Sequence, residues 1–255
     1  MTNVGIIGAT VEELRMFATD GNLRVGFPRQ IGEHVWIVRA GMGAARAGIA
    51  VERLLETAGP MPLISWGTAG ALNDSLHPGD ILLPSQVIEV ASGHALETEA
   101  SWRSAIMSMC GNAFRINSSP LLQTDGIIAH PKQKRALLET HEAAGIDMES
   151  AAIAAAAKNH GLPFLTLRVI VDAAGDRIPI AANAGVDDEG NVHPLRIARA
   201  LMRYPYELPA LLALGRNFSM ARHTLRKLAR LALEGKLAPT SSLSSCLSSK
   251  THATH

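Results

Sequence analysis

The sequence predicts an α/β fold in which helices cover both faces of a largely parallel sheet. Short apolar segments alternate with segments of helical periodicity along most of the chain. Several apolar segments lack a polar residue at every second position, which is typical of strands buried on both faces. The chain has 255 residues, of which 47% are hydrophobic and 18% charged. This length and composition suffice for one large domain with a full core.

The elements are expected in an alternating order. Strands are predicted at residues 4–9, 35–38, 62–66, 80–83, 86–90, 121–128 and 164–171. Helices are predicted at residues 11–18, 44–58, 151–157 and, as one long helix, 205–232. This order is typical of βαβ units, because parallel strands need a crossover connection.

The predicted helix over residues 151–157 begins at a polar cluster. Its alanines are the strongest helix formers, and Asp147 and Ser150 are candidates for capping it. We expect Glu149 in the first turn, where free N–H groups favour an ionised carboxylate. A helix of small residues packs closely, so it can bring this carboxylate into the interior, where it suits binding of sugar hydroxyls. A capped helix with a solvated Glu149 is the alternative.

Three strands end in glycine loops, and a fourth ends at Asp172. The loop glycines are Gly8, Gly41, Gly43, Gly67 and Gly70. Ligands of open α/β sheets bind beyond the carboxyl ends of strands, and glycine lets them approach backbone N–H groups. The sequence therefore predicts a pocket here, with ligand-free tight turns as the alternative. The glycine spacing matches neither the dinucleotide nor the Walker fingerprint, so we expect no cofactor.

Other signals favour a cytoplasmic protein without a metal centre. The two cysteines, Cys110 and Cys246, indicate no disulfide framework, and the histidines lack ligand spacing. The first residues lack the basic and apolar regions of a signal peptide, and no segment reaches the length of a membrane span. No Ser-His-Asp order is present.

The charge is unevenly distributed along the chain. Residues 1–191 carry 14 Lys and Arg against 21 Asp and Glu, whereas residues 192–238 carry 9 against 2. Within the basic segment, apolar residues from Leu211 to Ala232 recur at helical spacing and form a stripe. The sequence therefore predicts a main domain over residues 1–190, a basic amphipathic helical arm over residues 191–237, and a disordered Ser/Thr/His-rich tail over residues 238–255.

The arm has two candidate roles. It packs on the domain or on a second subunit, or it lies on an anionic membrane surface as an interfacial helix. Nucleic acid is disfavoured as a partner because no aromatic residues interleave the basic ones.

Five motifs in order resemble the superfamily of purine nucleoside phosphorylases and methylthioadenosine/adenosylhomocysteine nucleosidases. They lie at residues 5–13, 40–43, 67–81, 147–150 and 168–172, and the resemblance covers residues 4–175. It implies a phosphorylase-like three-layer fold with a central, mostly parallel mixed sheet flanked by helices. Residues 188–196 and 208–214 resemble one branch, the hopanoid-associated phosphorylases.

The resemblance implies cleavage of an N-glycosidic bond through an oxocarbenium-like state. In the hopanoid branch the substrate is adenosylhopane and the product is adenine, with phosphate or water as nucleophile. A soluble methylthioadenosine or adenosylhomocysteine nucleosidase is the runner-up. A nucleoside-binding or membrane scaffold protein without turnover is a third hypothesis. The family also implies a homo-oligomer.

The resemblance assigns roles to particular residues. Asp172 protonates purine N7 as the base leaves, and Glu13 positions the nucleophilic water, with the adjacent Glu12 as the alternative. Glu149 binds the ribose 2′- and 3′-hydroxyls. The substrate also meets Met148, Ile127 and Gly70, and the nucleophile pocket consists of Gly8, Gly41, Gly43 and Thr68.

Two departures from the family weaken part of this expectation. Ser65 stands where hexameric bacterial phosphorylases carry a phosphate-binding Arg, which favours water as nucleophile unless Arg39 or Arg46 compensates. Ile127 stands where the nucleosidases stack an aromatic ring on the base, so it offers the purine only dispersion contacts.

Overall fold

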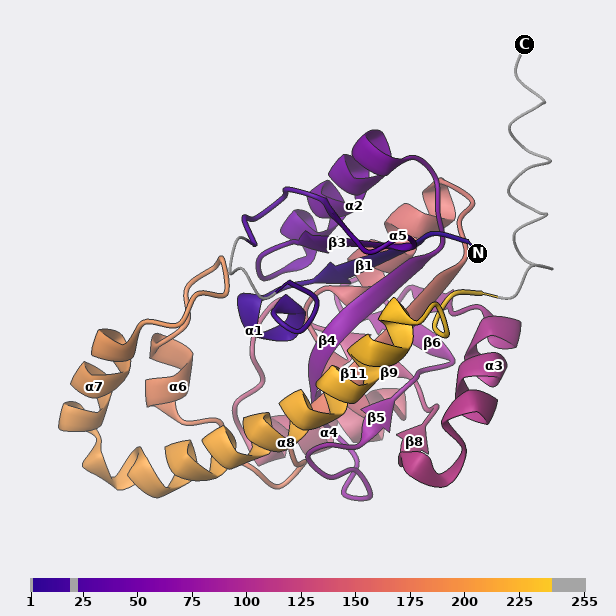
Figure 1. Cartoon of the computed structure of the whole chain (residues 1–255). Coiled ribbons are helices and arrows are strands. Elements are labelled where there is room, and N and C mark those ends of the chain that lie inside the picture. The colour runs from indigo at the N-terminus through magenta and orange to yellow at the C-terminus, as the bar shows by residue number, and fades with distance from the viewer. Residues whose placement is uncertain (1, 19–22, 240–255) are drawn as a thin grey trace, which may run out of the picture.

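In the computed structural model, which describes residues 2–18 and 23–239, two parallel strands form the centre of a mixed sheet (Figure 1). They are β4 (Leu63–Ala71) and β11 (Phe164–Asp172). Every residue of β11 is buried, as its nearly continuous apolar sequence predicts for a strand covered on both faces. Thr166, Arg168 and Asp172 are the polar exceptions in this strand.

The sheet contains both parallel and antiparallel pairs. Its strands follow the order β2-β3-β1-β4-β10-β9-β6-β7, and β11, β5 and β8 continue from β4. The pairs β1–β3, β1–β4 and β4–β11 are parallel, whereas β10 is antiparallel to β4. The predicted α/β class, with a mostly parallel mixed sheet flanked by helices, is confirmed.

The other strands are short. Their bounds are β1 (Val4–Gly8), β2 (Arg29–Ile31), β3 (Val35–Arg39), β5 (Ile81–Leu82), β6 (Gln86–Glu89), β7 (Ala95–Glu97), β8 (Ile116–Asn117), β9 (Leu121–Gln123) and β10 (Gly145–Asp147). The strand expected over residues 121–128 ends at Gln123. There the Thr124 hydroxyl donates to Gly126 O (2.9 Å), which turns the chain.

Helices cover both faces of the sheet. On one face α2 (Ala44–Ala58) and α5 (Ser150–Asn159) pack against each other over a core that includes Val51, Leu54 and Ile153. Helix α8 (Leu208–Leu233) crosses the opposite face over β11 (Figure 1). The remaining helices are α1 (Val11–Leu14), α3 (Ala100–Cys110), η1 (Gly111–Ala113), α4 (Pro131–His141), α6 (Ile180–Ala184), α7 (Pro194–Arg203) and η2 (Pro205–Glu207).

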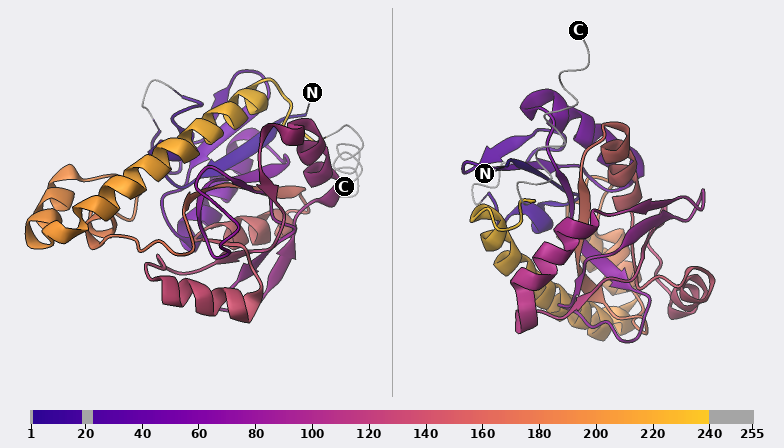
Figure 2. Two further views of the ribbon diagram at one scale, coloured as in Figure 1. Left: turned by 90° about the horizontal axis from the view of Figure 1, so that it is seen from below. Right: turned by 90° about the vertical axis from the view of Figure 1, so that its right-hand side faces the viewer.

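The long helix predicted over residues 205–232 is confirmed as α8, but the C-terminal segment also contains α7, which the sequence did not predict. Helices α6 and α7 and the first turns of α8 project beyond the sheet, as Figure 2 shows. The apolar stripe of α8 is buried only from Ala221 onward, whereas Leu212 is 56% exposed. The first half of α8 extends past the edge of the sheet, so the sheet offers it no surface for burial.

Two further observations concern the arm and tail. Within residues 2–18 and 23–239, no helix combines the length and apolarity needed to cross a bilayer. The tail predicted to be disordered lies outside the described residues from residue 240 onward. The domain boundary at residue 190 stays a prediction.

Candidate active site

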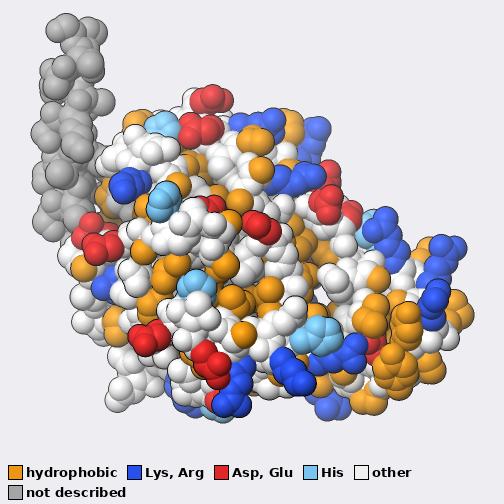
Figure 3. Space-filling view, turned by 180° about the vertical axis from the view of Figure 1, so that it is seen from behind, with side chains coloured by type: hydrophobic (Ala, Val, Ile, Leu, Met, Phe, Trp, Pro, Cys, Tyr) orange, Lys and Arg blue, Asp and Glu red, His pale blue; other side chains and the backbone are white. Residues whose placement is uncertain are grey.

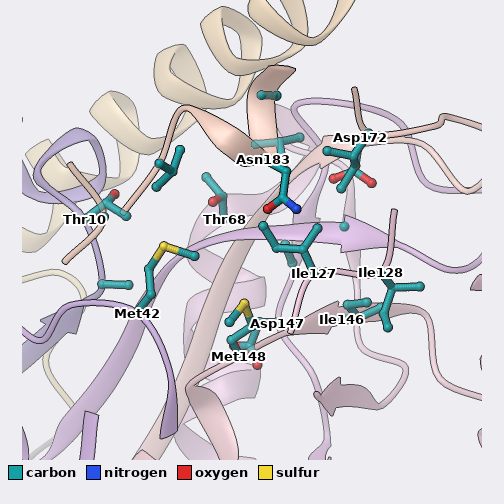
Figure 4. Close-up of a pocket in the computed structure, with 18 of the residues that line it drawn as sticks. Thr10, Met42, Thr68, Ile127, Ile128, Ile146, Asp147, Met148, Asp172 and Asn183 are labelled. Atoms are coloured by element: carbon teal, nitrogen blue, oxygen red, sulfur yellow. The ribbon is translucent and has the colours of Figure 1, made fainter. Parts of the chain in front are cut away.

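A cavity of about 260 Å³ opens at the ends of the central strands, below the projecting arm (Figure 4). Its floor comes from the loops after β1 and β10 and from the last residues of β4 and β11. Seven of the predicted site residues line it. They are Glu13, Thr68, Gly70, Ile127, Met148, Glu149 and Asp172.

Glu13 is buried after β1, and its carboxylate accepts four hydrogen bonds. Oε2 accepts from the N–H groups of Ala9 and Thr10, both at 3.1 Å. Oε1 accepts from the N–H and the hydroxyl of Thr68, at 2.8 and 2.9 Å. Thr10 caps α1 and accepts from the N–H of Glu13, so the two residues form a capping box. The helix start thereby fixes the carboxylate beside the cavity.

Trp66 on β4 holds the backbone of Glu13 in place. Its indole Nε1 donates to Glu13 O (2.9 Å), and its ring packs edge-on against Phe17, with centroids 5.1 Å apart. Glu12 is partly exposed and pairs with Arg15 at 3.0 Å. The local geometry therefore favours Glu13 over Glu12 as the carboxylate of the site.

Arg168 on β11 lies fully buried beneath the cavity floor. Its Nη2 donates to Ser65 Oγ (2.8 Å) and Ser150 Oγ (3.1 Å). The same atom lies 2.7 Å from Asp147 Oδ2 and 3.9 Å from Glu149 Oε2. Buried carboxylates need a nearby countercharge, and this guanidinium supplies it. Ser65 thus belongs to a network under the floor and does not line the cavity.

Gly67 leaves room for these charged groups. A Cβ at residue 67 would collide with the guanidinium of Arg168 and the carboxylate of Glu13. Gly67 lies inside β4 and not in the loop that the sequence predicts, and glycine is required there for packing of the buried charges.

Glu149 occupies the N-cap of α5, which corrects its predicted place in the first turn. Its φ and ψ of −133° and −27° lie outside the helix, because the chain leaves β10 extended. Asp147, two residues before the N-cap, accepts from the N–H of Ser150 (3.3 Å), the first residue of α5. Glu149 Oε1 accepts from the N–H of Gly43 (2.8 Å). Burial and, next, the charge of Asp147 raise the pKa of Glu149 to about 7, against the opposing influence of Arg168.

Asp172 ends β11 at a bulge, where the pairing with β4 shifts register after Ile170. Bulges of this kind re-aim side chains near active sites. The side chain of Asp172 is buried, and Lys134 of α4 donates to its Oδ2. Burial raises the pKa of Asp172, although the Lys134 ammonium acts in the opposite direction. A raised pKa keeps more of this carboxyl protonated, as a proton donor requires.

Residues 178–186, which include α6, form the apolar roof of the cavity together with the arm. The roof residues are Ile178, Ala182, Val186, Val192, Leu214 and Phe218. Asn183 of α6 is the polar member of this side, and its amide lies above Ile127 (Figure 4). Sequence reasoning predicted the arm but did not place it over the site.

Three of the expected nucleophile-pocket residues do not line the cavity. Gly8 lies against Leu14, and the N–H of Gly43 is bound to Glu149. Gly41 lies against the carbonyl of Asp188, whose loop covers this part of the chain. The predicted contribution of Gly8, Gly41 and Gly43 to a nucleophile pocket therefore stays a prediction, since they border the site without lining this cavity.

The two arginines proposed to replace the missing phosphate ligand also point elsewhere. Arg39 donates to Glu189 O and to Asn191 Oδ1 (2.7 Å), which anchors the loop of the arm. Arg46 lies beside Gly41, and neither arginine lines the cavity. Among the described lining residues, Lys134 is the cation, and it is bound to Asp172.

Sequence reasoning missed two buried cations of the site. Arg168 carried a usable signal, because a charged residue inside an apolar strand predicts a buried partner. No sequence signal marked Lys134 as buried, since the neighbouring charged residues of α4 are exposed. Within residues 2–18 and 23–239, no three or more His, Cys, Asp and Glu residues gather as metal ligands.

Comparisons with known proteins agree with this architecture. The family model of the phosphorylase superfamily matches residues 3–202. A 5′-methylthioadenosine/S-adenosylhomocysteine nucleosidase of Shewanella oneidensis is 28% identical over 177 residues, which cover 62% of this chain and 75% of that protein.

Solved structures share the fold at low sequence identity. A Helicobacter pylori nucleosidase variant holding 5′-methylthioadenosine superposes with a TM-score of 0.63 and 15% identity, covering 90% of this chain and 99% of that one. The futalosine hydrolase of Helicobacter pylori superposes with a TM-score of 0.63 and 16% identity, covering 90% of this chain and 97% of that one. Together with the family match, which spans most of the chain, these findings show that the protein belongs to the phosphorylase superfamily.

Proposed function

We propose that this enzyme hydrolyses the N-glycosidic bond of a purine nucleoside. The observation that carries the proposal is the placement of Glu13, Glu149 and Asp172 around one cavity, each in a different electrostatic setting. Asp172 is the proton donor to the base, and Glu149 binds the ribose hydroxyls. Glu13 positions the nucleophilic water and accepts a proton from it through Thr68. Retention of all three groups speaks against a binding or scaffold protein without turnover.

The proposed reaction has two steps, departure of the base and addition of water. The bond between C1′ and the purine breaks, and Asp172 gives its proton to N7 of the leaving base. Water then bonds to C1′ and gives a proton to the Thr68 hydroxyl, which passes its own proton to Glu13 Oε1, 2.9 Å away. The fixed dipoles around Glu13 need no rearrangement during this step.

Water is the nucleophile that the charges favour. Phosphate requires strong cationic donors, and the single lining cation among the described residues is already bound to a carboxylate. The name nucleosidase, carried by the relative from Shewanella oneidensis, also supports hydrolysis.

The nucleophile is tested by product analysis. We expect adenine release from 5′-methylthioadenosine at the same rate with and without phosphate, and a free sugar as product. Asp172→Asn should abolish release while leaving nucleoside binding measurable by calorimetry. A sugar 1-phosphate product would replace hydrolysis by phosphorolysis, and persistent release in the variant would remove Asp172 as the acid.

We further propose a lipid-linked adenosine, adenosylhopane, as the physiological substrate. The roof residues are apolar, as a site for a hydrocarbon 5′-substituent requires. The cavity itself is small for a nucleoside plus a polycyclic tail, so the tail would extend along the arm. Adenine release from adenosylhopane in detergent, with methylthioadenosine as competitor, decides between this substrate and the soluble nucleosides. Release from methylthioadenosine alone would make the protein a methylthioadenosine/adenosylhomocysteine nucleosidase.

A membrane surface is the partner we propose for the projecting end of the arm. Leu195 and Met202 on α7 are 79% and 77% exposed. The exposed arginines of the same helix are Arg196, Arg199 and Arg203. Figure 3 shows hydrophobic and basic side chains side by side at this end. Such a helix suits an anionic lipid surface, to which each basic residue contributes about 1 kcal/mol.

Vesicle sedimentation tests the membrane surface. We expect salt-sensitive binding to vesicles containing phosphatidylglycerol, and its loss in the double variant Leu195→Glu/Met202→Glu. Leu233→Glu is the matched control, because Leu233 is exposed at the opposite end of α8. Equal sedimentation of all three proteins would exclude α7 as the docking helix.

Two expectations complete the proposal. We propose a cytoplasmic protein attached peripherally to the inner face of the membrane, and a homo-oligomer. Cell fractionation measures the first and light scattering the second, and a soluble monomer would contradict both.

A further inference from the structure

Lys134 is the most deeply buried charged residue of its helix. The side chain is 1% exposed, whereas the neighbouring Lys132 and Arg135 on α4 are exposed. Removing an ammonium group from water is costly unless charged or polar partners replace the water. A lysine in this position therefore needs a compensating interaction, and the cavity wall supplies it.

The ammonium group of Lys134 has a complete set of acceptors. Nζ donates to Oδ2 of Asp172, to Ala173 O (2.7 Å) and to Asp176 O (3.2 Å). Three acceptors match the three donors of a charged lysine. The group is thus fixed in orientation, and it leaves Oδ1 of Asp172 without a lysine contact.

We propose that Lys134 is a positioning residue for protonation of the leaving base. It holds Oδ2 of Asp172, so that Oδ1 carries the proton toward the purine. This inference rests on the proposed hydrolysis, in which Asp172 is the acid.

The same contact assists the proton transfer itself. Before transfer the ammonium faces a neutral carboxyl, and after transfer it faces a carboxylate. The attraction therefore grows as the proton leaves Asp172, so it stabilises the transition state more than the ground state. A neutral residue at position 134 cannot supply this difference.

The pH dependence has a definite sign. Two charged groups face Asp172: Lys134 lowers its pKa and Asp176 raises it, while burial raises it further. Because the acid must be protonated, activity falls as the pH rises through its pKa. Loss of the Lys134 charge raises that pKa, so the alkaline limb of the profile moves to higher pH.

The test uses Lys134→Gln and Lys134→Met, with Lys132→Gln as the matched control on the same helix. Each variant is assayed with 5′-methylthioadenosine and with a ribofuranoside whose leaving group is 4-nitrophenolate. The nitrophenolate leaves without protonation, so its release does not depend on an acid. Unfolding curves of all variants separate catalytic from folding effects.

We expect kcat/KM for the nucleoside to fall by about 100-fold in both Lys134 variants. The alkaline limb should move up by about one to three pH units. The nitrophenyl ribofuranoside should be cleaved at nearly the wild-type rate. Lys134→Arg should restore the limb, because it restores the charge.

Three results would overturn the inference. An equal loss of activity toward both substrates would give Lys134 a structural role only. A reduced rate with the nucleoside and an unmoved alkaline limb of the pH profile would lead to the same conclusion. An unchanged nucleoside rate in Lys134→Gln would remove Lys134 from the reaction while leaving the proposed function intact. By contrast, a wild-type enzyme that releases no base would contradict the proposed function itself. An active Asp172→Asn variant would remove Asp172 as the acid and with it the role of Lys134.

Discussion

The floor and the roof of the cavity differ in polarity. The floor carries Glu13, Glu149 and Asp172 over the buried guanidinium of Arg168. The roof, formed by the segment around α6 and by the arm, is apolar except for Asn183. Reaction chemistry needs fixed charges, whereas recognition of a substituent needs contact area. Under the proposed function we therefore expect the floor to perform the cleavage and the roof to select the substrate.

The largest expected effect comes from Arg168→Met. The change leaves the carboxylates around the floor without their countercharge, so we expect a loss of roughly 3–5 kcal/mol in the free energy of unfolding. Urea denaturation measures it. Arg135→Met, which removes an exposed pair with Glu139, is the control and should change stability by less than about 1 kcal/mol. A stable Arg168→Met protein would show that the floor does not depend on this charge.

Glu149 offers a pH test of the floor. Its pKa is about 7, so it becomes ionised as the pH rises through that value. Hydrogen bonds to an ionised acceptor are roughly twice as strong as neutral ones. The KM for a nucleoside should therefore fall as the pH rises from about 6 to about 8, a range of about two pH units centred on that pKa. In Glu149→Gln the KM should be higher and independent of pH, and a variant that keeps the pH dependence would exclude Glu149 as its source.

A roof substitution should separate substrates without damaging the floor. Phe218→Ser removes an apolar side chain that is already 40% exposed, so the fold should tolerate it. We expect a loss of about 1–3 kcal/mol in transition-state binding of the lipid-linked nucleoside, seen in kcat/KM. Methylthioadenosine should be cleaved almost as before. Equal losses for both substrates would mean that the roof does not contact the 5′-substituent selectively.

The smallest expected effect concerns the cap that holds Glu13. Thr10→Ala removes the hydroxyl that accepts from the N–H of Glu13 (3.3 Å). We expect about 1 kcal/mol lower stability, as for other N-cap losses, and a modest fall in kcat. Thr10→Ser keeps the hydroxyl and should behave as the wild type. A Thr10→Ala enzyme with unchanged stability would show that Thr68 and the N–H groups of residues 9 and 10 suffice to fix the carboxylate.

The floor was more predictable than the roof, and particular residues show why. Glu149 and Asp172 stand at a helix start and a strand end, which the local pattern of apolar and polar residues locates, whereas Glu13 was assigned by the family resemblance. The apolar stripe of α8 predicted a helix but not its two halves, since burial from Ala221 onward depends on where the sheet ends. The resemblance to the superfamily is confirmed, and the hopanoid branch stays a prediction.

By itself the sequence determined the alternation of strands and helices and the strand ends at which the acidic residues gather, because these follow from local periodicity and turn chemistry. Only the tertiary structure decided which glycines face protein groups, that Lys134 reaches Asp172, and that the arm covers the cavity. These features join residues far apart in the chain, such as Lys134 and Asp172 or Arg39 and Asn191. Their contacts depend on how the helices and strands pack, and no local pattern of residue types encodes which distant residues meet.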